Sequence, residues 1–105
     1  MSTVLIVDDD DQLRRSFEKL LLEEGYKVIC AASGEAAYPV VCGQAVDLTI
    51  LDVRLPGMDG LATFKLIYEQ EPKLPVIIMT AYGTTETAIE ATKLGAFDFI
   101  LTGMP

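Results

Sequence analysis

Short runs of apolar residues alternate along the chain with segments in which apolar residues recur every three or four positions. The runs are apolar at nearly every position, which is typical of strands covered on both faces of a parallel sheet. They predict strands at residues 4–7, 27–31, 48–51, 75–79 and 97–101. Strands that alternate with helices in this way predict a parallel α/β sheet with right-handed crossovers.

The first two helices are predicted from their caps and their apolar faces. Asp10 or Asp11 can cap the first helix, and Gly25 ends it. Its apolar face consists of Leu13, Phe17, Leu20 and Leu21. Ser33 can cap a second helix that runs to about residue 43, and Pro39 inside it should kink or shorten it.

Two more helices follow the third and fourth strands. The turn-rich residues 56–60 precede a helix whose apolar face carries Leu61, Phe64 and Ile67. The fourth helix is predicted at residues 85–94, and Gly95 closes it. We find no internal repeat or linker, so residues 1–105 are predicted to form one domain.

The amino-acid composition argues against several classes of function. The formal net charge of −8 argues against direct binding of nucleic acid, and the absence of histidine excludes histidine-based catalysis and zinc sites with histidine ligands. Cys30 and Cys42 fit no metal or redox spacing, so we expect both to be reduced and structural. No apolar run approaches the ~20 residues of a membrane span, so we expect a soluble, cytoplasmic protein without membrane contact.

Polar residues gather where the predicted strands end. Asp8 and Asp9 follow the first strand, Asp52 ends the third, Thr80 ends the fourth and Thr102 follows the fifth. These ends share one edge of a parallel sheet, where open α/β sheets bind ligands. If the strand order is 2-1-3-4-5, the three aspartates converge, and their repulsion calls for a hard cation such as Mg²⁺. Carboxylates, a metal and a hydroxyl make a phosphoryl-transfer pocket.

A simpler interpretation of these residues is local. Aspartates after strands often cap helices, and we assign Asp10 and Asp11 to that role. A threonine at a strand end usually bonds nearby backbone. Asp8 and Asp9 stand at the end of one predicted strand and Asp52 at the matching end of another, which favours the functional interpretation. The place of Thr80, one strand away from Asp52, favours a functional role for its hydroxyl as well.

Four blocks of sequence resemble the receiver domains of response regulators. They are LIVDDD at residues 5–10, DLTILD at 47–52, LPGMDG at 55–60 and VIIMTA at 76–81. The similarity covers essentially the whole chain. AYG at residues 81–83 together with GAFD at 95–98 looks most like the receivers of NtrC-like regulators that act with sigma-54 polymerase.

The resemblance implies a flavodoxin-like (CheY-like) doubly wound sheet of five parallel strands in the order 2-1-3-4-5. It implies that Asp52 accepts a phosphoryl group from a sensor histidine kinase, and that Asp9, Asp52 and the backbone carbonyl of Arg54 ligate Mg²⁺ while Asp8 orients it. Thr80 would turn its hydroxyl to the phosphate, and Phe99 would be the aromatic switch. The chain would then be no enzyme beyond its own phosphorylation and dephosphorylation. It would switch an effector domain that regulates transcription in a longer parent protein.

The sequence departs from the family in two places. The family's lysine after the fifth strand is Thr102 here, which forfeits a charge-assisted hydrogen bond worth about 1.5–3 kcal/mol. The chain also stops before a fifth helix, so we expect a truncated fragment whose sheet is partly bare at Phe97, Phe99, Ile100 and Leu101. Such a patch favours a homodimer or domain exchange.

Three other functions remain open. Thr102 favours a pseudo-receiver that binds partners without phosphorylation. The acid trio would also suit a stand-alone Mg²⁺-dependent phosphatase or phosphotransferase, but Arg54 replaces the second general acid expected two residues after Asp52. A flavin site is disfavoured, because the acidic first loop lacks a phosphate cradle.

Overall fold

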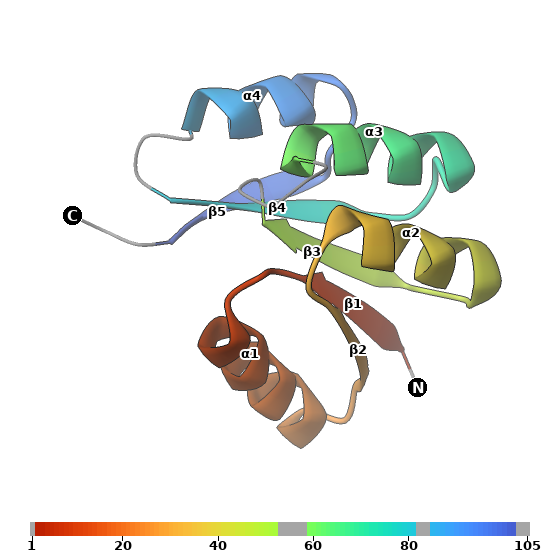
Figure 1. Ribbon diagram of the computed structural model, residues 1–105, viewed down its shortest axis with the longest axis vertical. Helices are drawn as coiled ribbons and strands as arrows, with labels where there is room; N and C mark the ends of the chain where they lie inside the picture. The colour runs from red at the N-terminus through yellow and green to blue at the C-terminus, as the bar shows by residue number, and fades with distance from the viewer. Residues whose placement is uncertain (1, 53–58, 82–84, 103–105) are drawn as a thin grey trace.

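A central parallel sheet with helices on both faces makes up the computed structural model, which describes residues 2–52, 59–81 and 85–102 (Figure 1). Strands and helices alternate along the chain as predicted. The strands are β1 (Thr3–Val7), β2 (Lys27–Ala31), β3 (Leu48–Asp52), β4 (Val76–Ala81) and β5 (Asp98–Thr102). The helices are α1 (Asp11–Glu23), α2 (Gly34–Gly43), α3 (Gly60–Gln70) and α4 (Thr85–Lys93).

The strand order is β2-β1-β3-β4-β5, and all four pairings are parallel. This confirms the predicted order 2-1-3-4-5. The chain therefore reverses its direction of travel across the sheet between β1 and β3. Val7 of β1 pairs with Leu51 of β3, so the next residue of each segment, Asp8 and Asp52, lies at the same end of the sheet.

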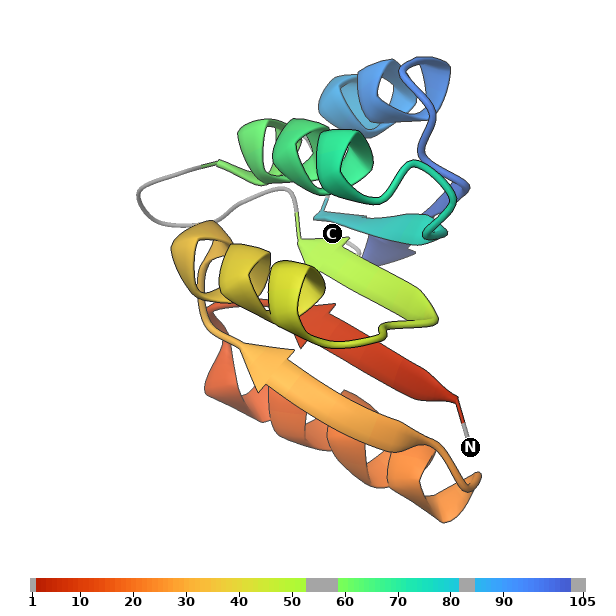
Figure 2. The same cartoon turned by 90° about the vertical axis from the view of Figure 1, so that its right-hand side faces the viewer.

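The helices divide unequally between the two faces. Figures 1 and 2 show α1 alone on one face, beside β1 and β2, and α2, α3 and α4 together on the other. The face under α2–α4 carries the larger core, in which Leu5, Leu51 and Ile78 are fully buried. The α1 face carries a smaller core made of Val4, Ile6, Ile50 and Met79, against which Leu13, Phe17 and Leu21 pack.

Local signals in the sequence define the helix ends. Asp10 is the N-cap of α1, and its side chain accepts hydrogen bonds from the backbone N–H groups of Gln12 and Leu13. Ser33 caps α2 in the same way through the N–H of Ala36. Gly25 follows α1 with a φ of 92°, a conformation that only glycine adopts without strain. The predicted caps at Asp10 and Ser33 and the stop at Gly25 are confirmed, whereas Asp11 is the first residue of α1 and not its cap.

The sequence predictions for Leu20 and Pro39 need correction. Leu20 is 60% exposed and is not part of the apolar face of α1, which Leu13, Phe17 and Leu21 form. Of the two effects predicted for Pro39, a kink or a shorter helix, the shortening is absent, since α2 continues to Gly43, the predicted end. Cys30 and Cys42 are free thiols, as predicted, and both are exposed.

In the part of the chain that the structure describes, no helix follows β5. Phe97 is 70% exposed and Ile100 is 42% exposed, as the absence of a covering helix predicts. Phe99 differs, because it packs against the core under α2–α4 and is only partly exposed. Nothing is described of the Leu101 side chain. Among the described residues, no helix is long and apolar enough to cross a membrane.

Candidate metal and phosphoryl site

Three carboxylates meet at the C-terminal edge of the sheet. Asp8 follows β1, and Asp52 is the last residue of the neighbouring β3. One carboxylate oxygen from each of Asp8, Asp9 and Asp52 lies within 4.8 Å of the other two. The convergence predicted from the sequence is therefore present.

Asp8 is the most confined of the three. Its side chain is fully buried, whereas Asp52 is half-buried and Asp9 is exposed. Asp8 Oδ1 accepts a hydrogen bond of 2.9 Å from the backbone N–H of Asp10. Burial raises the pKa of Asp8 to about 6, with a further rise from the neighbouring Asp52 and Asp9 carboxylates, while the Asp10 N–H opposes this shift.

The three carboxylates suit a small, hard cation as ligands. Asp8 Oδ2 is buried and accepts no hydrogen bond from the described residues. A buried carboxylate oxygen without a donor is costly, and a cation would satisfy it. Three clustered carboxylates provide the hard oxygen ligands and the negative charge that Mg²⁺ prefers. The residues present therefore fit this ion.

The other predicted site residues are placed by the backbone. Thr80 lies on β4, one residue beyond Met79, the partner of Asp52 across the sheet. Thr102 ends β5 opposite Ala81, so both threonines lie at the same edge as the carboxylates. Phe99 lies further back on β5, opposite Ile78. Arg54 lies outside the described residues.

Arg14 is a residue that the sequence analysis did not single out. Its guanidinium donates a hydrogen bond of 2.6 Å to the backbone carbonyl of Asp8 and forms an ion pair with Asp11. The ion pair follows from the three-residue spacing of Asp11 and Arg14 on a helix, which the sequence shows. The hydrogen bond from Arg14 to the Asp8 carbonyl could not be predicted without the three-dimensional path of the loop.

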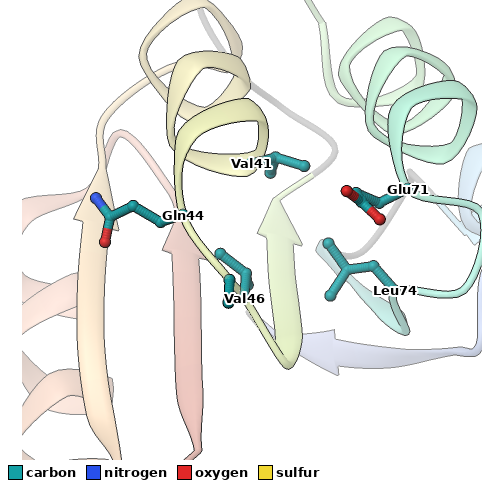
Figure 3. Close-up of a pocket in the computed structure, with 6 residues that line it drawn as sticks. Val41, Gln44, Val46, Glu71 and Leu74 are labelled. Carbon is teal, nitrogen blue, oxygen red and sulfur yellow. The ribbon is translucent and has the colours of Figure 1, made fainter.

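A pocket of about 240 Å³ lies at the other end of the strands, where β3 and β4 begin. It is lined by residues at the end of α2, before β3, and between α3 and β4: Val41, Gln44, Ala45, Val46, Glu71 and Leu74. Figure 3 shows Val41, Glu71 and Leu74 directed toward the same space between the two helices. Because the strands are parallel, this pocket is separated from the three carboxylates by the length of the sheet.

Known proteins provide an independent comparison. A family model described as "Response regulator receiver domain" matches residues 4–102. The transcriptional regulatory protein ZraR of Escherichia coli (strain K12) is 46% identical over 98 residues, which are 93% of this chain and 22% of ZraR. The chain thus spans about a fifth of the length of the curated relatives it matches.

Solved structures of response regulators have the same fold as this chain. NtrX from Brucella abortus, in complex with ADP, superposes with a TM-score of 0.91 at 34% identity, over 100% of this chain and 24% of that one. The response regulator TrrA from Thermotoga maritima, in complex with Mg²⁺-BeF, has a TM-score of 0.87 at 29% identity, over 99% of this chain and 89% of that one. The chain belongs to the receiver-domain family of two-component response regulators and is most similar to NtrC-like receivers.

Proposed function

We propose that this receiver domain is phosphorylated on Asp52 by a sensor histidine kinase. The Asp52 carboxylate oxygen attacks the phosphorus of a phosphohistidine, and an O–P bond forms as the P–N bond breaks. The electron pair of that bond returns to the imidazole nitrogen. The observation that carries this proposal is the convergence of Asp8, Asp9 and Asp52 around a buried Asp8 oxygen to which none of the described residues donates a hydrogen bond.

Asp9 and Asp52 would hold Mg²⁺ together with the backbone carbonyl of Arg54, and Asp8 would orient the ion. When bound, Mg²⁺ neutralises the charge that builds up on the transferred phosphoryl oxygens. The similar TrrA was solved in complex with Mg²⁺-BeF, which supports Mg²⁺ as the ion. The only chemistry that we assign to the chain is its own phosphorylation and dephosphorylation.

Thr80 and Phe99 would transmit the signal. A phosphoryl group adds negative charge and acceptor oxygens at Asp52, and a hydroxyl on the neighbouring β4 can bond to them. Movement there would change the packing of the half-buried Phe99 on β5. The effector would be a transcriptional output domain in a longer cytoplasmic protein, because relatives such as ZraR are transcriptional regulators several times longer than this chain.

Thr102 favours a second candidate, a pseudo-receiver that binds its partners without phosphate. Threonine stands at the end of β5, where the family has lysine, so the site lacks that cation. The three carboxylates favour phosphorylation instead, since a module that never handled phosphate would gain nothing from their mutual repulsion.

Intact-mass spectrometry separates the two candidates. The chain is incubated with Mg²⁺ and acetyl phosphate, and we expect a mass gain of one phosphoryl group. Asp52→Asn removes the nucleophile and should abolish the gain. Asp59→Asn makes the same chemical change at the N-cap of α3, where asparagine caps equally well, and should retain the gain.

The result is decisive if folding and Mg²⁺ binding are measured on the same sample. A folded chain that binds Mg²⁺ and gains no mass would contradict phosphorylation and favour the pseudo-receiver. Replacing Thr102 with lysine would then show whether the missing cation is the reason. A gain that persists in Asp52→Asn would place the phosphoryl group elsewhere.

A further inference from the structure

Arg14 is unusually confined for an arginine on the first turns of a helix. Its side chain is only 18% exposed. One guanidinium nitrogen, Nη1, donates to the backbone carbonyl of Asp8 at 2.6 Å, and the other, Nη2, pairs with the Asp11 carboxylate. One planar group thus ties the loop after β1 to the first turn of α1.

The loop that Arg14 contacts carries two of the three carboxylates. The backbone N–H of Asp8 donates to the carbonyl of Ala31 on β2 at 3.1 Å, and its Oδ1 accepts from the N–H of Asp10 at 2.9 Å. With the bond from Arg14 to its carbonyl, Asp8 is held at three points. Its Oδ2 is left as the oxygen available to a ligand.

We propose that Arg14 is a positioning residue for the metal site. By fixing the Asp8 carbonyl, its guanidinium sets the direction in which the chain leaves β1, and hence where the Asp8 and Asp9 carboxylates lie relative to Asp52. The inference rests on the proposed function insofar as the ligand is Mg²⁺. Groups that orient metal ligands typically change metal affinity 10- to 100-fold when removed.

Charge alone predicts the opposite effect. Arg14 is a cation close to a cluster of three carboxylates, so its removal would make the cluster more negative and tighten Mg²⁺ binding. Positioning predicts weaker binding in spite of this. Lysine keeps the charge but lacks the planar fork that serves a carbonyl and a carboxylate together. Arg14→Lys therefore separates geometry from charge.

The test compares Arg14→Ala and Arg14→Lys with Arg15→Ala. Arg15 is the next residue on α1 and is exposed, so its substitution removes the same charge from the same helix. Calorimetric titration with Mg²⁺ should show binding weakened about tenfold or more in Arg14→Ala. Arg14→Lys should be weakened several-fold, while Arg15→Ala should be unchanged or slightly tighter.

A second measurement requires no metal. Hydrogen exchange of the Asp10 amide reports its bond to Asp8 Oδ1, and the exchange should accelerate in both Arg14 variants but not in Arg15→Ala. If Arg14→Ala does not fold, Arg14→Lys gives both measurements.

Two results would overturn the proposal: Mg²⁺ binding as tight as wild type in the Arg14 variants, or unchanged exchange at Asp10. Failure of the proposed function would look different. In that case the wild-type chain itself would bind no Mg²⁺, and Asp10 exchange alone would decide the role of Arg14.

Discussion

At the scale of single residues, the fold brings together like charges that repel one another. Asp8 is fully buried beside Asp52, and its raised pKa means that the folded chain holds a proton more tightly there than the unfolded chain does. Buried charge of this kind opposes folding unless a proton or a cation offsets it. The clustered carboxylates therefore lower the stability of the fold when neither a proton nor a cation is bound.

Without metal, stability should fall as the pH rises through the range between the two pKa values of Asp8. The pKa is 3.8 for the ordinary group and about 6 in the folded chain. The stabilising proton is fully present below about pH 4 and is lost as the pH passes through 6. We expect a loss of up to about 3 kcal/mol, measured by urea unfolding in EDTA.

Asp8→Asn isolates this contribution from the other acidic groups. Asparagine keeps the acceptor for the Asp10 N–H but cannot ionise, so the variant should be the more stable above pH 6 and its advantage should shrink toward pH 4. Excess Mg²⁺ should stabilise the wild type at pH 7 much more than the variant. A difference between the two chains that does not change with pH would contradict the assignment.

The sequence predicted which carboxylates would meet but not how each would be held. Strand ends, the parallel pattern and the strand order 2-1-3-4-5 that the family resemblance implied were together enough to bring Asp8, Asp9 and Asp52 together. The contact from Arg14 to the Asp8 carbonyl could not be predicted, because it depends on the exact path of a loop and on a backbone atom. A backbone acceptor has no signature in the sequence.

At the scale of elements, α2 is the weakest match between sequence and structure. Pro39 is the sixth residue of the helix Gly34–Gly43, so it has no N–H to donate to the carbonyl four residues earlier. The helix persists because Ala37 and Val41 are buried in the core on its inner side. Tertiary packing thus overrides local propensity, which is why Pro39 does not shorten the helix as the sequence suggested.

Pro39→Ala should stabilise the chain. Pro39 is exposed, so the substitution restores a backbone hydrogen bond without removing core contacts. We expect a gain of about 1–3 kcal/mol, seen as a higher urea midpoint with an unchanged slope.

Pro72→Ala is the matched control and should change stability in the opposite direction. Pro72 is the second residue of a turn closed by the bond from the Leu74 N–H to the Glu71 carbonyl, a position that suits the fixed φ of proline. Its loss should cost about 0.4–1 kcal/mol. Equal effects at the two prolines would show that helix position is not what matters.

At the scale of the whole molecule, the two faces of the sheet are covered unequally. Among the described elements, α1 alone covers its face and lies beside β1 and β2, whereas three helices cover the other face (Figures 1 and 2). Ile100 pairs with Met79, a member of the α1-side core, so it lies on the α1 face near its open end. It is 42% exposed on β5, which is also an edge strand. Apolar surface next to an unpaired strand edge favours self-association.

We therefore expect this 105-residue chain to associate as its concentration rises, and Ile100→Lys to prevent it. Lysine places a charge on both the apolar surface and the strand edge. Ile89→Lys is the matched control, since Ile89 is equally exposed at 42% but lies on α4, on the other face. In sedimentation equilibrium, the average mass of the wild type and of Ile89→Lys should rise with concentration, while Ile100→Lys should stay monomeric. A wild-type chain that is monomeric throughout would mean that the α1 face is sufficiently covered by the chain itself.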